Sequence, residues 1–290
     1  MTWPERIDEV FFGPETGRRL VLVRTGLLVL VGARIALGPY RDLAGTPDAL
    51  FEPAGVLWWI DRMPSSTAIA AIQVVGACAV AGALAWPRRS RLPAILGWVC
   101  LLVLAGLRGS RGKVLHNDLL LLWVVVPFLA APLEARWGDR TPSRAWGWPV
   151  RSGAAVAAVV YALSGFHKLV TTGIDWALGD NIRNVLLWGS PASPRWESLS
   201  TWVADHALAY RGIGLVMLAV ELTFPLVLLW RRLQPWYALA AVGLHVATYA
   251  LLGLDYWAWA AVAGLLFVDW PNTTPALRRR ASKGSPRVAT

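Results

Sequence analysis

Apolar residues in this chain gather into eight runs separated by short polar stretches. A helix needs about 20 apolar residues to cross the hydrocarbon core of a bilayer, and most of the runs approach that length. Prolines stand near many of the run ends, where helices begin and stop. The pattern predicts an all-α fold, a polytopic helical membrane bundle of one domain with about eight transmembrane helices. The predicted spans are residues 20–37, 66–86, 93–107, 114–132, 150–170, 212–230, 235–254 and 256–269.

Two connections between these runs are long, at residues 38–65 and 171–211. Both mix tryptophan and leucine with acidic residues, a composition typical of helices that lie in a membrane interface. We therefore expect interfacial helices on the outer side of the bundle, covering it as lids. The chain is predicted to divide into a cytoplasmic N-terminal segment at 1–19, a transmembrane domain at 20–270 and a basic, disordered cytoplasmic tail at 271–290.

The composition agrees with a membrane protein. Of the 290 residues, 56% are apolar and 16% are charged, against about 25% charged residues in soluble domains. The 18 tryptophans suit a membrane interface, where the ring is in an apolar region and the N–H stays in contact with water. No nucleic-acid partner is expected, because the basic residues behind the net charge of +10 lie between the apolar runs and in the tail.

The distribution of basic residues predicts the orientation. With eight crossings, arginine and lysine concentrate on the side that carries both termini, so both termini are predicted to be cytoplasmic. The stretch RGSRGK at 108–113 is an exception, since it places three cations on the opposite side. We expect a multi-pass protein of the cytoplasmic (inner) membrane, with anionic lipid at the cytoplasmic face as a partner.

Polar residues inside the predicted spans are the candidates for chemistry, because charge within a bilayer is costly and usually faces the bundle interior. The stretch YALSGFHKLVTTGIDW, residues 161–176, ends the fifth span. On a helix, Tyr161, Ser164 and Lys168 fall on one stripe. A lysine kept out of water can act as a neutral general base. The alternative is that Lys168 extends from the end of the span to the interface and is solvated there.

His116, Asn117 and Asp118 open the fourth span in the stretch HNDLLLL. A histidine at this point could position or exchange a proton, and Asp118 could hold one tautomer of its ring. The alternative is a helix cap, in which Asn117 or Asp118 binds the first turn, and the two roles are compatible. Because this span starts on the side where the fifth span ends, His116 and Lys168 are expected to meet.

Further ionisable side chains lie within the other spans. Arg24 and Arg34 are both in the first span but do not share one stripe. An intramembrane arginine often pairs with a carboxylate or binds an anion, and Glu221 is the predicted counter-charge, near Pro225, which should kink its helix. That pair is either structural or functional. His245 is interpreted as a core histidine bonded to a backbone carbonyl, with a role in the site as the alternative.

No metal site is predicted. The four histidines lie on different segments, and the two cysteines, Cys78 and Cys100, lie in apolar runs without a C-x-x-C motif. The cysteines are therefore expected to pack between helices. The chain also lacks a phosphate-binding loop, a nucleophile elbow and a zinc-protease motif, which removes the commonest hydrolase and nucleotide chemistries.

Several short motifs together resemble one membrane protein family. They are VLVRTGLLV in the first span, FEPAGVLWW, HNDLLLL, Y-x-x-S-G-x-x-K-L followed by D-W-x-x-G, E-L-x-F-P-L-x-L-L, and a late H-x-x-x-Y-x-L-L-G. Over about residues 15–270 the chain resembles the HTTM family, bacterial membrane proteins related to vitamin K-dependent gamma-glutamyl carboxylase. The resemblance covers the transmembrane part of that enzyme only.

The resemblance implies a chemistry and a set of residues. The family's enzyme deprotonates a reduced naphthoquinone with a lysine, after which oxygen drives removal of a glutamate γ-proton and carbon dioxide adds. Lys168 matches the catalytic lysine and His116 an important histidine, and a reduced, menaquinone-like quinone is the implied cofactor. The residues expected to line or brace the pocket are Arg24, Asn117, Tyr161, Ser164, Trp176, Glu221 and His245.

The leading hypothesis is therefore a carboxylase-like, quinone-binding enzyme of the bacterial inner membrane, with Lys168 as general base and His116 as its partner. The alternative is a non-catalytic membrane factor, either for maturation of or immunity to a secreted peptide, or a lipid-binding scaffold. A thiol-disulfide protein or a small secreted peptide is a candidate partner. A transporter is a third hypothesis, which inverted repeats and paired broken helices would support, and the sequence shows neither.

Overall fold

The structure, a computed structural model, describes all residues except 1, 112–116, 190–193, 269 and 271–290. The described part is built of helices, apart from one two-residue antiparallel pairing of β1 (Glu15–Thr16) with β2 (Pro142–Ser143). This confirms the all-α class that the apolar runs predict. The α-helices are α1 Trp3–Phe12, α2 Gly17–Leu37, α3 Ser66–Ala85, α4 Arg91–Gly109, α5 Leu119–Leu129, α6 Arg144–Thr172, α7 Asp175–Leu178, α8 Asn181–Asn184, α9 Glu197–Asp205, α10 Ala207–Thr223, α11 Leu226–Leu229, α12 Gln234–Leu252 and α13 Trp257–Phe267.

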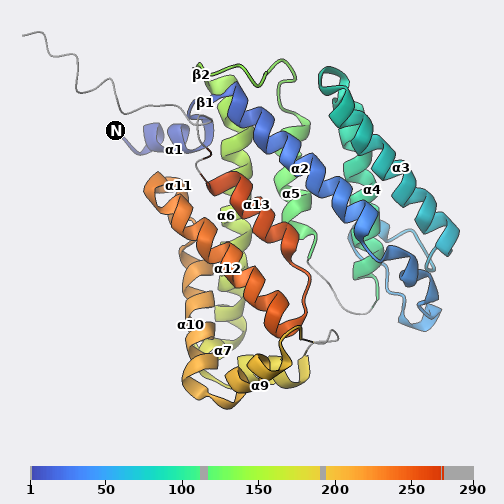
Figure 1. Ribbon diagram of the computed structural model, residues 1–290, viewed down its shortest axis with the longest axis vertical. Coiled ribbons are helices and arrows are strands. Elements are labelled where there is room, and N and C mark those ends of the chain that lie inside the picture. Colours follow the sequence, from blue (N-terminus) through green and yellow to red (C-terminus); the bar gives the residue numbers. More distant parts are fainter. Residues whose placement is uncertain (1, 112–116, 190–193, 269, 271–290) are drawn as a thin grey trace, which may run out of the picture.

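The long helices run alternately in opposite directions along the bundle (Figure 1). One end carries α1, β1, β2 and the last turn of α13, and we call it the amino-terminal end. The opposite end carries residues 38–65, which contain 3₁₀ turns, together with α7 and α9. Each long helix therefore joins one end of the bundle to the other, and residues distant in sequence meet at both ends.

Among the residues that the structure describes, five helices are long and apolar enough to cross a membrane. They are α2, α3, α4, α6 and the helix of residues Arg231–Leu252, which contains α12. A sixth candidate is the pair α9 and α10, which is bent by 97° at its break. The apolar helices α5 and α13 are shorter, at 11 residues each. The predicted span at 212–230 is interrupted where Pro225 separates α10 from α11, because proline cannot continue the hydrogen-bond ladder.

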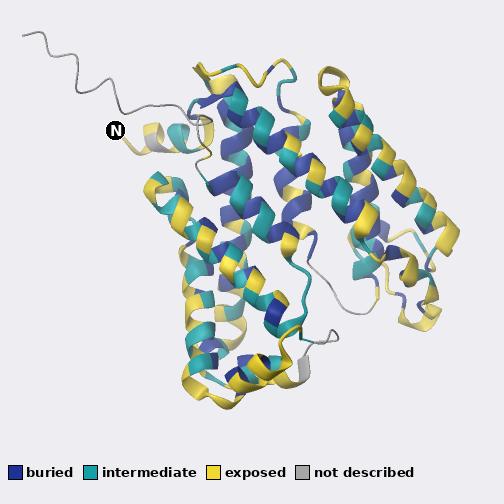
Figure 2. Cartoon of the chain, viewed as in Figure 1, coloured by how far each residue is buried: buried dark blue, intermediate teal, exposed yellow. Residues whose placement is uncertain are grey.

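Helix α2 forms the centre of the bundle. Leu20, Val23, Leu27, Val31 and Ile35 are each at most 1% exposed, and their spacing of three or four residues keeps them on one face. This helix contacts α3, α4, α5, α6 and α13. Figure 2 shows buried residues along the inner sides of α2, α5 and α6. A single core therefore joins helices from the whole described chain.

The close contact between α3 and α4 involves one of the two cysteines. A Cβ atom on Gly76 would lie 2.7 Å from the Cβ of Cys100, so glycine permits an approach that a larger residue would prevent. Cys100 is buried at this contact, as the sequence predicts for a packing residue. Cys78 is exposed on the surface of the bundle, so the expectation that it also packs between helices is wrong.

Ion pairs, some of them buried, hold the segments at the amino-terminal end of the bundle together. The Glu15 side chain is 1% exposed and accepts a 2.5 Å bond from Arg231 Nη2, while Arg151 Nε lies 3.0 Å from the same carboxylate oxygen. Arg144, at the start of α6, pairs with Asp8 of α1 at 2.5 Å. Through these contacts the segment before α2 is tied to α6 and to the turn before α12.

Candidate functional site

An ion pair joins Lys168, near the end of α6, to Glu221, near the end of α10. Lys168 Nζ donates to both carboxylate oxygens of Glu221 at 2.5 Å, and Ser164 Oγ donates to Oε1 at 3.2 Å. The Glu221 side chain is 7% exposed and that of Lys168 is 19% exposed. The structure thus brings together three of the residues that the sequence singles out, and it gives Lys168 a carboxylate partner rather than a purely solvated end.

Two glycines explain why the chain can place Lys168 in this way. Gly165 lies one turn before Lys168, and a Cβ atom there would come within 2.9 Å of the Glu221 Cβ, so only glycine lets α6 approach α10 so closely. Gly173 ends α6 with a φ of 70°, a conformation that glycine adopts at little cost. The turn returns the chain so that the Trp176 ring lies 4.7 Å from Lys168 Nζ, in a cation–π contact.

A second polar pair, Tyr161 with His245, lies deeper in the bundle. The Tyr161 hydroxyl and His245 Nε2 are 2.8 Å apart, and the Tyr161 ring stacks on Phe224 with a centroid distance of 4.2 Å. The His245 ring stacks on Tyr256 at 5.7 Å. The prediction of a core histidine is right about burial, since His245 is 8% exposed. It omits the tyrosine partner, which lies 84 residues earlier in the chain.

Both pairs face one cavity of about 580 Å³. Its walls come from the helices α5, α6, α10, α12 and α13, and they are mostly apolar and aromatic. A cavity of this size, with few polar groups on apolar walls, is typical of a small-molecule site. The lining residues are Leu119, Trp123, Val160, Tyr161, Leu163, Ser164, His167, Lys168, Met217, Glu221, Leu244, His245, Thr248, Leu254, Tyr256 and Trp259.

Asn117 braces this cavity from behind its aromatic wall. Its side-chain Nδ2 donates to the backbone carbonyl of Asp255 at 2.7 Å. Its backbone carbonyl accepts a 2.8 Å hydrogen bond from Trp259 Nε1. These bonds fix the segment between α12 and α13, which supplies Tyr256 and Trp259 to the wall. Asn117 therefore acts through its neighbours, as a supporting residue.

Asp118 belongs to a buried ion cluster at the end of the bundle that carries residues 38–65. Arg34 Nε lies 2.6 Å from Asp118 Oδ1 and Arg34 Nη1 lies 2.5 Å from Asp255 Oδ2. Tyr40 donates to Asp118 at 3.4 Å, and burial raises the pKa of the Tyr40 hydroxyl. Asp118 stands at the cap position of α5, but its side chain makes no capping bond. This corrects the expectation that Asp118 caps the first turn.

The predicted pairing of a first-span arginine with Glu221 is wrong. Arg34 pairs with Asp118 and Asp255, and Glu221 pairs with Lys168. Arg24 is also placed elsewhere than in the Lys168 cavity, since it donates to the carbonyl of Pro132 at 3.1 Å near the amino-terminal end. The error arises because residue spacing shows which face of a helix carries a charge but not which helix packs against that face.

His116 lies outside the described residues, so its expected meeting with Lys168 remains a prediction. Among the residues that the structure describes, no group of three or more His, Cys, Asp or Glu side chains is arranged to hold a metal ion. The aromatic wall residues Trp123, Tyr256 and Trp259 were not singled out from the sequence. With 18 tryptophans in the chain, composition alone could not distinguish those of the wall from those at the surface.

Comparisons of the chain with protein family models, with curated proteins and with solved structures return no match. The geometry of the cavity and the motifs in the sequence are therefore the features that bear on function. Of these, the stripe of Tyr161, Ser164 and Lys168 carries most weight, because all three side chains line the cavity.

Proposed function

We propose that this chain is a membrane-embedded, carboxylase-like enzyme that binds a reduced quinone in the Lys168 cavity and removes a proton from it. The observation that carries the proposal is the contact of Lys168 Nζ with both Glu221 oxygens at 2.5 Å on the wall of an aromatic cavity. Ionisable groups inside apolar bundles are costly and mark functional sites. The HTTM-like motifs point to the same lysine.

The proposal includes eight membrane crossings, with α5 and α13 crossing beside longer neighbours. The alternating directions of the helices support an even number of crossings, with α1 and the end of α13 at the same end (Figure 1). In the proposed orientation the amino-terminal end is cytoplasmic, in a bacterial inner membrane, because Arg88, Arg136 and Arg232 gather there. Residues 38–65 and α7–α9 then lie at the outer interface.

A reduced quinone fits the cavity by its chemistry. The volume of about 580 Å³ lies within the usual range of roughly 300–1,000 Å³ for small-molecule sites. Trp123, Tyr256 and Trp259 offer aromatic faces to a planar ring, and a hydrophobic ligand could enter from the lipid. The polar groups of Lys168 and Glu221 gather on one wall, where they would orient a hydroxyl group.

The protein's own contribution would be to accept and hold a proton. A bound quinol supplies an acidic hydroxyl group. Lys168 Nζ donates directly to Glu221 Oε1, so the pair could take up one further proton as an ammonium beside a neutral carboxylic acid. Ser164 stabilises Oε1 by its hydrogen bond, and Trp176 shields the amine from water on one side. The Tyr161–His245 pair offers a second place for a proton within the same cavity.

The experiment is quinol binding and turnover by the purified chain in liposomes. Menaquinol would be followed by tryptophan quenching for binding and by oxygen-dependent loss of its absorbance for turnover. Lys168→Met and Glu221→Gln should each lower turnover by at least about a hundredfold, the usual contribution of a positioned acid–base group. Arg144→Gln breaks an exposed pair with Asp8 and serves as the control, with unchanged turnover.

The same variants separate the enzyme from a non-catalytic membrane factor. Unchanged turnover in Lys168→Met would refute the catalytic proposal. A folded wild-type protein that binds no quinol and tolerates Lys168→Met would instead favour the scaffold or maturation factor. Solvent extraction of a quinone from the purified protein would support the enzyme, independently of any turnover assay.

A further inference from the structure

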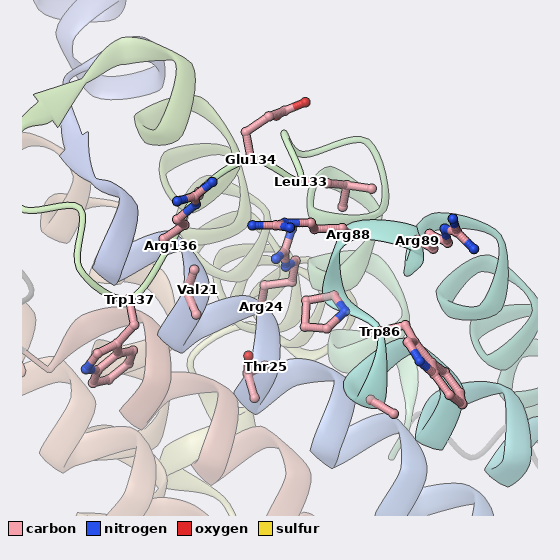
Figure 3. A pocket seen from close by; sticks show the side chains of 13 residues that line it. Val21, Arg24, Thr25, Trp86, Arg88, Arg89, Leu133, Glu134, Arg136 and Trp137 are labelled. Carbon is pink, nitrogen blue, oxygen red and sulfur yellow. The ribbon is translucent and has the colours of Figure 1, made fainter.

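A second cavity, of about 480 Å³, opens at the amino-terminal end of the bundle (Figure 3). It lies between the first turns of α2, the connection of α3 to α4, and the connection of α5 to α6. These segments meet only through folding, since the first and last lining residues, Val21 and Trp137, are 116 residues apart in the chain. The cavity shares no lining residue with the Lys168 cavity.

Positive charge dominates the lining of this cavity. Figure 3 shows the guanidinium groups of Arg24, Arg88 and Arg136 directed toward one another, while the carboxylate of Glu134 points away. Within the described part of the chain, none of these three arginines takes part in an ion pair closer than 4 Å. The three converging cations outnumber the one carboxylate of the lining, Glu134, which acts electrostatically on Arg24, so the net field in the cavity favours an anion.

Arg24 is the buried member of the group. It is 6% exposed, and its Nη1 donates to the carbonyl of Pro132 at 3.1 Å. A guanidinium group carries five N–H donors, so this bond leaves donors free on the side that faces the cavity. Burying a cation is costly unless the cation gains a partner. A buried arginine with unused N–H donors at a cavity wall therefore indicates a site for an anion.

We infer that this cavity binds the phosphate group of an anionic phospholipid. Several guanidinium groups around one point match a phosphate, which accepts paired N–H bonds from arginine. The apolar wall, which includes Val21 and Leu133, suits the glycerol and first carbons of a lipid better than a free ion. Trp86 and Trp137 are 67% and 52% exposed beside the cavity, and exposed tryptophans are typical of the headgroup level.

The site is independent of the proposed quinone chemistry, and its test needs no activity. The full-length chain in detergent would be titrated with phosphatidylglycerol and, separately, with phosphatidylcholine of the same acyl chains, and bound lipid would be counted by native mass spectrometry. Inorganic phosphate would be added as a competitor. The variants are Arg88→Gln and Arg136→Gln, both at exposed loop positions where a change should not disturb folding, and Arg24→Gln.

The matched control is Arg232→Gln, which removes one exposed charge at the same end but outside the cavity. The wild type should retain phosphatidylglycerol in preference to phosphatidylcholine. Each cavity variant should weaken phosphatidylglycerol binding by about tenfold, the effect of losing one charge-assisted hydrogen bond, while Arg232→Gln changes it by less than about twofold. Equal retention of both lipids, an equal loss in Arg232→Gln, or displacement of the lipid by inorganic phosphate would each overturn the proposal.

Discussion

The backbone of Gly165 lies directly against the side chain of Glu221. Gly165 is one helical turn before Lys168, which pairs with the carboxylate of the same Glu221. The position of the ion pair therefore depends on how closely α6 and α10 approach each other. Gly165 therefore controls the geometry of the pair of Lys168 and Glu221, because a methyl group at position 165 would have no room between the two helices.

Gly165→Ala should push α6 away from α10. Overpacking of this kind costs about 1–3 kcal/mol, and the separation should also loosen the bond between Lys168 and Glu221. The measurement is thermal unfolding in detergent, with quinol binding as a second readout. Gly243→Ala in α12 is the control, since a Cβ atom there meets nothing within 4 Å. An equal effect of both substitutions would contradict the importance of the close contact.

Lys168 and Glu221 should be strongly coupled in stability. Lys168→Met leaves the mostly buried Glu221 carboxylate without its partner, which should lower the free energy of unfolding by about 3 kcal/mol. The double variant Lys168→Met and Glu221→Met should recover most of that loss, because no charge remains to be desolvated. A double-mutant cycle measures the coupling directly. Simple addition of the two single effects would show that the pair does not exist in the folded protein.

Tyr161 contributes through two separable contacts. Tyr161→Phe removes the bond to His245 but keeps the ring on Phe224, and it should cost about 1 kcal/mol. Tyr161→Leu loses the ring stacking as well, and should cost about 1 kcal/mol more. Unfolding midpoints of the two variants, compared with that of the wild type, would separate the contributions. Identical midpoints for the two variants would mean that the 4.2 Å stacking adds nothing.

The two carboxylates that bind Arg34 should differ in their effects. The Asp118 side chain is 4% exposed and that of Asp255 is 34% exposed. Asp118→Asn should therefore cost about 3–5 kcal/mol, as expected when a buried charge loses a buried partner, although Arg34 keeps its contact with Asp255. Asp255→Asn should cost about 1 kcal/mol or less, because the Asp255 carboxylate is one-third exposed and water screens its interaction with Arg34. Thermal unfolding at low and high salt checks both expectations, and a salt-sensitive loss in Asp118→Asn would contradict the burial of that pair.

Much of the fold can be predicted from local sequence. The apolar runs predict the helices, Pro225 predicts the break between α10 and α11, and the spacing of Tyr161, Ser164 and Lys168 predicts a shared face that lines one cavity. These features depend on the period of a single helix. They require no knowledge of which helices are neighbours.

The partners of the buried charges could not be predicted in the same way. Glu221 was expected to neutralise a first-span arginine, but it binds Lys168, while Arg34 binds an aspartate 84 residues later. Each choice depends on the rotation of one helix against another, which is decided by small residues such as Gly165 and by the packing of the whole core. Residue type indicates that a charge needs a partner, and only the assembled bundle determines which one.

Helix α6 carries an ion-paired basic residue toward each of its ends. Arg151 is held by Glu15, and Lys168 is held by Glu221 seventeen residues later, with no Asp, Glu, Lys or Arg between them. At 1.5 Å per residue the two lie about 26 Å apart, close to the roughly 30 Å thickness of a hydrocarbon layer. In a bilayer with longer acyl chains, one of these two charges would lie inside the hydrocarbon layer. The protein should therefore be most stable in lipids of a particular chain length, and its stability should fall as that length increases.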